Sequence, residues 1–160
     1  MNNQRLWVRI DNRLVHGQVV ETWLPYSNAK VLIVANDELA EDELRQEVLR
    51  LAVPKGVRIL FLAVHNVPSF LNNPGPKLNA SDVFVLFSSC EDVKVAYLNG
   101  LSFSCLNVGN IHYSQGKCQI CDHIALNQEE MACLRYLREQ GIKLDFRCLP
   151  NTQVTAKINL

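Results

Sequence analysis

Short apolar runs alternate with amphipathic patterns along the whole chain, and this alternation constrains the fold more than any other feature. Val31–Ala35 and Ile59–Ala63 are continuous apolar runs of strand length. Such runs are typical of strands buried on both faces, as in a parallel sheet. Parallel strands need long crossover connections, which are usually helices. The sequence therefore predicts an α/β fold, in which residues 1–160 form a single doubly wound domain with a mainly parallel central sheet and helices on both faces.

The expected elements follow one another with short connections. The predicted strands are Leu6–Ile10, Lys30–Ala35, Arg58–Val64, Val83–Phe87, Ser102–Val108, Gln119–Ala125 and Leu144–Leu149. The predicted helices are His16–Leu24, Asp37–Ala52, Val64–Leu71, Glu91–Leu98 and Gln128–Gln140. Pro25 is expected to end the first helix, and one apolar face of the second is expected to carry Leu44, Val48 and Leu51. The tail from Asn151 to Leu160 fits either a short helix or an extended arm.

Composition narrows the class of protein. The chain has 160 residues, 48% hydrophobic and 20% charged, which is ordinary for a soluble globular domain. Its 16 basic and 16 acidic residues give no net charge, so nucleic acid is not an expected partner. No segment approaches the roughly 18 consecutive apolar residues of a membrane span. The first residues also lack the apolar core of a signal peptide, so a cytoplasmic location is expected.

Cysteine is unusually frequent, with six residues in the chain. In the cytoplasm a disulfide framework is not expected. Cys105, Cys118 and Cys148 lie in apolar stretches and are expected to act as small core residues. Cys118 and Cys121 have C-x-x-C spacing with His123 close by, so a zinc site is an alternative. A structural zinc site usually needs a second pair of ligands, however, and no metal is predicted.

The strongest functional signal lies in Val8–Val19. An apolar run ends at Ile10, a charged loop follows, and a helical pattern begins after His16. His16 is therefore predicted where a strand ends and a helix begins, which in an open α/β sheet is the crevice where ligands bind. The start of a helix also presents free N–H groups that favour an anion such as phosphate.

The residues around His16 suit phosphoryl chemistry. Arg13 can bind a phosphoryl group through its bidentate fork, while Asp11 and Asn12 flank the same loop and Asp11 can orient the imidazole. Gly17 leaves room for close approach to the backbone. The alternatives are a histidine that caps or packs the helix, a solvated arginine and a turn-forming aspartate. Because neutral imidazole is a good nucleophile for phosphorus near pH 7, the combination predicts a phosphoryl-accepting site.

A second polar loop, Asn107–Lys117, follows another predicted strand. The ends of parallel strands meet at one edge of a sheet, so this loop is expected to face the His16 loop, with Asn110 and Lys117 supporting the phosphoryl site. An ordinary surface loop is an equal alternative. His65 also follows a strand and is a candidate second site histidine, although a polar residue at a strand end is the favoured interpretation. The Gly-x-Gly-x-x-Gly and Walker A patterns are absent from the sequence, which argues against a nucleotide-dependent enzyme.

Arg9–Val19, with the sequence Arg-Ile-Asp-Asn-Arg-Leu-Val-His-Gly-Gln-Val, closely resembles the phosphorylation-site motif of one protein family. This family comprises the enzyme IIB subunits of the mannose, fructose and sorbose branch of the bacterial phosphotransferase system. Ile33–Glu38 resembles the family's second strand and its loop, and Asn107–Tyr113 resembles its Asn-Val-Gly segment. The resemblance runs from Trp7 to about Pro150. The sequence of the Asn-Val-Gly segment is most similar to the N-acetylgalactosamine branch of the family.

The resemblance implies a cytoplasmic phosphocarrier peripheral to a membrane complex. His16 would accept a phosphoryl group on Nδ1 from a phosphohistidine of enzyme IIA and pass it to a sugar bound by the membrane subunits IIC and IID. That activity is a protein-phosphohistidine–sugar phosphotransferase, which needs no metal, nucleotide or other cofactor. A regulatory IIB-like protein that binds partners without sugar transport would carry the same motif. The Cys-rich segment Cys118–Cys148 departs from the usual family sequence.

Overall fold

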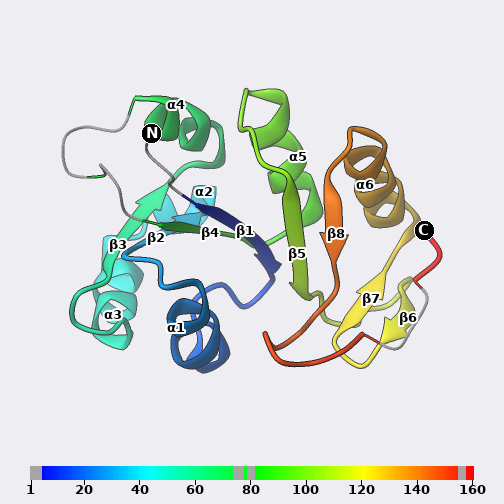
Figure 1. Cartoon of the computed structure of the whole chain (residues 1–160), viewed down its shortest axis with the longest axis horizontal. Coiled ribbons are helices and arrows are strands. Elements are labelled where there is room, and N and C mark those ends of the chain that lie inside the picture. The colour runs from blue at the N-terminus through cyan, green and yellow to red at the C-terminus, as the bar shows by residue number, and fades with distance from the viewer. Residues whose placement is uncertain (1–4, 74–77, 79–81, 155–157) are drawn as a thin grey trace.

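The computed structural model describes residues 5–73, 78, 82–154 and 158–160. A six-stranded sheet runs through it in the order β3-β2-β4-β1-β5-β8 (Figure 1). Its strands are β1 (Leu6–Asp11), β2 (Val31–Ala35), β3 (Arg58–Leu62), β4 (Val83–Phe87), β5 (Cys105–Asn110) and β8 (Lys143–Asp145). The five strand pairings of this sheet are parallel, and the predicted fold class is confirmed.

Different helices cover the two faces of the sheet. One face carries α1 (Leu24–Ser27), α2 (Asp37–Ala40) and α3 (Glu43–Ala52), and the other carries α4 (Val67–Asn72), α5 (Cys90–Leu98) and α6 (Gln128–Glu139). A short 3₁₀ turn, η2 (Val64–Asn66), leads into α4. Successive residues of a strand point to opposite faces, so Val85 joins the apolar cluster beneath α5 while its neighbour Leu86 joins the cluster beneath α1.

The helix after β1 does not end at Pro25, as the sequence predicted. Helical backbone runs from Gly17 through a π-helical stretch, η1 (Val19–Trp23), into α1, which contains Pro25. In the shifted register the N–H of Leu24 bonds the carbonyl of Val19. Pro25 then falls in the first turn of α1, where a missing N–H is tolerated. The helix ends instead at Asn28, which has a left-handed φ of 53°.

The single helix predicted over Asp37–Ala52 is two helices. The first ends at Ala40 with Glu41 as its C-cap, and Asp42 then caps α3 by accepting a hydrogen bond from the N–H of Arg45 at 3.0 Å. Leu44, Val48 and Leu51 do share one face of α3, but that face points to solvent.

The strand predicted over Gln119–Ala125 is an antiparallel hairpin separate from the main sheet. It consists of β6 (Cys118–Cys121) and β7 (Ile124–Leu126), with the chain reversing between them. The strand predicted over Leu144–Leu149 is observed as β8, which begins one residue earlier, at Lys143, and already ends at Asp145. Residues 151–154 and 158–160 of the tail form neither helix nor strand, and 155–157 lie outside the described residues.

The cysteines are also placed differently from the prediction. Cys105 and Cys118 are exposed and Cys148 is partly exposed, whereas Cys90 and Cys133 are the buried ones. Burial raises the pKa of the Cys133 thiol to about 11, so this thiol stays protonated at neutral pH. All six cysteines are free.

Candidate functional site

His16 lies between the carboxyl end of β1 and the following helix, where the sequence placed it. The chain leaves β1 toward β2 on one side, while α5 connects β4 to β5 on the other side of β1. This reversal is the topological switch point at which open α/β sheets bind ligands. The turn is made by Leu14, whose backbone is left-handed with a φ of 56° and whose N–H donates to the carbonyl of Asp11 at 2.9 Å. Such a leucine costs about 1–3 kcal/mol and needs support from the surrounding structure. Its buried side chain, in the cluster beneath α1, supplies that support.

The imidazole of His16 is held by Asp11. Its Nε2 lies 2.8 Å from Oδ2 of Asp11, and the histidine side chain is 16% exposed while the aspartate is fully buried. Burial alone would raise the pKa of Asp11, but hydrogen bonds from His16 and Asn110 and the charge of Arg9 outweigh it and lower the pKa. An ionised carboxylate only accepts hydrogen bonds, so the ring proton lies on Nε2. In the neutral form of a ring held in this way, Nδ1 carries the lone pair.

Arg9 lies beneath this pair and was missed as a site residue in the sequence. It is fully buried, and its Nη2 donates to Asp11 Oδ2 at 3.0 Å and to Gln18 Oε1 at 3.1 Å. Its Nη1 donates to Asn107 Oδ1, and its guanidinium lies 4.9 Å from the ring centroid of Trp23. Burial lowers the pKa of Arg9, and the charge of Asp11 opposes that effect. The sequence did contain a signal for Arg9: it is a charged residue within an apolar strand, two positions before Asp11, so both side chains lie on the same face of the sheet.

A bulge in β5 brings two asparagines to the same place. Arg9 of β1 is paired with Asn107, but Asp11 is paired with Asn110, so Gly109 is an extra residue in β5. The side chain of Asn110 consequently faces the site, where its Nδ2 donates to Asp11 Oδ2 at 2.9 Å and to Gln18 Oε1 at 2.8 Å. A Cβ on Gly109 would overlap the guanidinium of Arg9. Glycine is therefore required there for space.

Three other predicted residues lie in the same segment as His16 and are held less tightly than Asp11. The N–H of Arg13 donates to Asp11 Oδ1 at 3.1 Å, and the Arg13 side chain is 43% exposed with Nε 3.9 Å from the same oxygen. Asn12 is exposed, and its N–H donates to the carbonyl of Asn110 at 3.1 Å. A Cβ on Gly17 would meet nothing within 4 Å, so the fold itself does not require glycine at this position.

The structure does not bring Lys117 into this network, which corrects the sequence prediction. Its Nζ lies 2.7 Å from Oε1 of Glu130, in the first turn of α6. Glu130 is also part of the capping box of that helix, so the lysine stabilises the start of α6. His65 is exposed in η2. In the part of the chain that the structure describes, no three His, Cys, Asp or Glu side chains are grouped to hold a metal ion.

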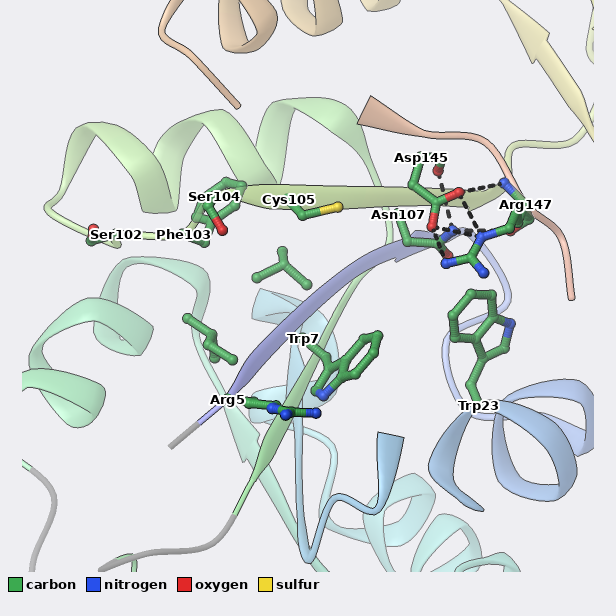
Figure 2. A pocket seen from close by; sticks show the side chains of 12 residues that line it. Arg5, Trp7, Trp23, Ser102, Phe103, Ser104, Cys105, Asn107, Asp145 and Arg147 are labelled. Carbon is green, nitrogen blue, oxygen red and sulfur yellow. Dashed lines mark hydrogen bonds and ion pairs between the residues drawn. The ribbon is translucent and has the colours of Figure 1, made fainter. Parts of the chain in front are cut away.

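A hollow of about 620 Å³ adjoins the site, and Trp7, Trp23, Asn107 and Arg147 are among its lining residues (Figure 2). The amide of Asn107 donates to the carbonyls of Asp145 at 3.1 Å and Arg147 at 2.9 Å. In Figure 2 the side chains of Asp145 and Arg147 meet as an ion pair, 2.8 Å apart, close to Trp23. Asn107 thus links the guanidinium of Arg9 to the backbone at the end of β8, which holds Arg9 in place.

The lowered pKa of Asp11 predicts a pH dependence of stability. The unfolded chain takes up this proton at a higher pH than the folded chain, so stability falls as pH drops from the unfolded value, near 4, through the folded pKa. Asp11→Asn is expected to be less stable than wild type at pH 7 and to lose less stability below about pH 4. Urea unfolding of both proteins between pH 2.5 and 7 measures this. Parallel pH profiles would contradict the prediction.

The fold and the site define a class of protein: an α/β domain that presents a histidine, held by a buried aspartate, at the switch point of a parallel sheet. Residues 5–159 match the family model described as the sorbose subfamily IIB component of the phosphotransferase system. The chain therefore belongs to this family of phosphotransferase-system IIB components, which are phosphotransferases of sugar transport. The resemblance found in the sequence is confirmed.

Two relatives and one solved structure match this chain over nearly their whole length. The chain is 34% identical to the sorbose-specific EIIB component of Lacticaseibacillus casei, covering 94% of this chain and 93% of the relative. It is 30% identical to an N-acetylgalactosamine-specific enzyme IIB component of Escherichia coli, covering 92% of each chain. The crystal structure of the IIB domain of the sorbose permease from Klebsiella pneumoniae superposes with a TM-score of 0.85 at 30% identity, over 94% of this chain and 91% of that one. No helix among the described residues is long and apolar enough to cross a membrane.

Proposed function

We propose that this chain is a phosphocarrier that accepts a phosphoryl group on Nδ1 of His16 from a phosphorylated IIA protein. It then passes the group to a sugar held by the membrane subunits IIC and IID, working on the cytoplasmic side of the membrane. The observation that carries the proposal is the 2.8 Å contact between His16 Nε2 and Asp11 Oδ2, which leaves Nδ1 with a free lone pair. Membership of the IIB family supports the same reading.

The transfer step needs no proton movement at this site. The bond between phosphorus and the donor's ring nitrogen breaks as the bond to Nδ1 forms, and the electron pair returns to the donor ring. The proton on Nε2 stays against Asp11 throughout, which keeps the His16 ring in one orientation. Such in-line transfer depends mostly on positioning and on stabilising charge. Arg13, the exposed cation of the loop, neutralises the phosphoryl oxygens.

Radioactive labelling tests the proposal. Incubation with phosphoenolpyruvate, enzyme I, the histidine phosphocarrier protein and a panel of IIA proteins should label wild type with at least one of them. His16→Ala should take up no label, whereas His65→Ala, which changes an exposed histidine elsewhere, should label normally. The label should be acid-labile, as phosphohistidine is. Label that persists in His16→Ala, or that survives acid, would refute His16 as the acceptor.

The second half of the proposal has its own measurement. Labelled protein is mixed with membranes that contain IIC and IID subunits and with a panel of hexoses and amino sugars. Loss of label to one sugar identifies the substrate and supports transport. Retention of label with every sugar and membrane preparation would favour the regulatory alternative, in which the protein binds partners without transport.

Arg13 is expected to speed the encounter with the donor as well as to bind the phosphoryl group. Arg13→Glu should slow labelling by phosphorylated IIA more at low salt than at high salt, because screening weakens long-range attraction beyond about 10 Å at 0.1 M salt. Rates measured between 20 mM and 500 mM salt test this, with Arg135→Glu on the exposed face of α6 as control. An equal loss at every salt concentration would mean that Arg13 acts only locally.

A further inference from the structure

The exposed apolar ridge of α3 lies beside the phosphoryl site and has no role in the transfer chemistry. Leu44, Val48 and Leu51 form this ridge at helical spacing, and they are 78%, 61% and 88% exposed. The apolar stripe of a surface helix normally faces the core. A contiguous apolar stripe turned to solvent is typical of an interaction surface.

A groove of about 290 Å³ joins the ridge to the loop that precedes His16. Leu44, Arg45 and Val48 line it from α3, and Arg13 and Leu14 line it from the loop. A molecule seated in this groove therefore contacts residues only two and three positions from His16. Of the described residues that line the groove, two are arginines and none is acidic.

We infer that the ridge and groove dock the phosphoryl donor, the phosphorylated IIA protein; the inference rests on the proposed function. Transfer between two histidines requires the donor ring to reach His16 within a few ångströms, so the donor must cover the Arg13 loop. Because the groove shares Arg13 and Leu14 with that loop, the covered surface continues onto α3 without interruption. Arg13, which is 43% exposed, complements the negative charge of the donor's phosphohistidine and favours fast, correctly oriented encounter. Arg45 adds less, because its Nε already lies 3.9 Å from a carboxylate oxygen of Asp42.

Two other occupants fit less well. A second copy of this chain docked on the groove would cover Arg13 and obstruct any donor, so dimerisation through this face conflicts with phosphoryl acceptance. The membrane subunits must also reach His16, but there the acceptor is a hexose or amino sugar without negative charge, for which an arginine-lined groove offers no electrostatic attraction. The donor is therefore the occupant that the charge and position of the groove favour.

The test uses the IIA protein that labels wild type. Leu44→Gln and Val48→Gln change the ridge, and Leu98→Gln on α5 changes an exposed leucine, 63% accessible, on a helix that covers the other face of the sheet. All three side chains are exposed, so the fold should be unaffected. The few residues that carry most of an interface's binding energy lie near its centre. We therefore expect kcat/KM for labelling to fall about tenfold in the two ridge variants through a higher KM, a change of about 1.4 kcal/mol, with no change in the control. Calorimetric titration with unphosphorylated IIA should show the same loss of affinity.

Normal labelling kinetics in both ridge variants would overturn the inference. If transfer to the sugar slowed instead, the groove would belong to the membrane subunits. If wild type self-associated in analytical ultracentrifugation and the ridge variants did not, it would belong to a second copy. Failure of wild type to take label on His16 is a different result, which refutes the proposed function. Titration with each unphosphorylated IIA protein of the panel still measures docking in that case.

Discussion

Arg9→Met is expected to lower the free energy of unfolding by about 3–5 kcal/mol, because it leaves the carboxylate of Asp11 buried without its cation. That loss is a large part of the roughly 5–15 kcal/mol that holds a typical domain together. Urea unfolding at pH 7 measures it. Arg135→Met, which alters an exposed arginine, should change stability by less than about 0.5 kcal/mol.

The double variant Arg9→Met with Asp11→Asn distinguishes the cause. If the cost comes from an uncompensated buried charge, removing that charge should make the double variant more stable than Arg9→Met alone. A double variant that is less stable by the sum of the two single losses would show that the ion pair is not the source. Labelling of the double variant should be slower than that of wild type, because the amide of Asn at position 11 holds the His16 ring less strongly than the carboxylate of Asp11 does.

Gly109→Ala is expected to slow labelling of His16 by about 100-fold, because small displacements of reacting groups have effects of that size. The new Cβ would occupy the space of the Arg9 guanidinium, which must move and take Asp11 and the imidazole with it. The same overpacking should cost about 1–3 kcal/mol of stability. Single-turnover labelling and urea unfolding measure the two effects.

The control for this prediction is to make Gly109→Ala in the Arg9→Met variant as well as in wild type. Methionine has no guanidinium for the new Cβ to strike, so the stability cost of Gly109→Ala should shrink when Arg9 is already replaced. Substitutions that share a contact are non-additive in this way, whereas independent ones add within about 0.5 kcal/mol. An unchanged cost in the Arg9→Met background would mean that the glycine serves another purpose, such as the backbone of the bulge.

The sequence alone determined the layered α/β architecture and the position of His16. Repeated apolar runs such as Val31–Ala35, separated by helical patterns, are typical of a covered parallel sheet, and the change from strand to helix pattern places His16 at its edge. These features are local, because hydrophobic periodicity is read over a few residues. The Asp11 and Arg13 positions beside His16 followed from the same short segment.

Only the tertiary structure decided how the site is built. In the sequence Arg9 is only one residue of a predicted strand, and its partner Asn107 is known only from the pairing of β1 with β5. The bulge at Gly109 turns the side chain of Asn110 toward Asp11. Lys117 follows the same polar loop but turns to Glu130 instead, because the hairpin carries it to the start of α6. Likewise the apolar face of α3 was visible in the sequence, but its exposure was not. Strand register, bulges and the packing of helices against a sheet depend on contacts between residues far apart in the chain, and periodicity within one segment carries no information about them.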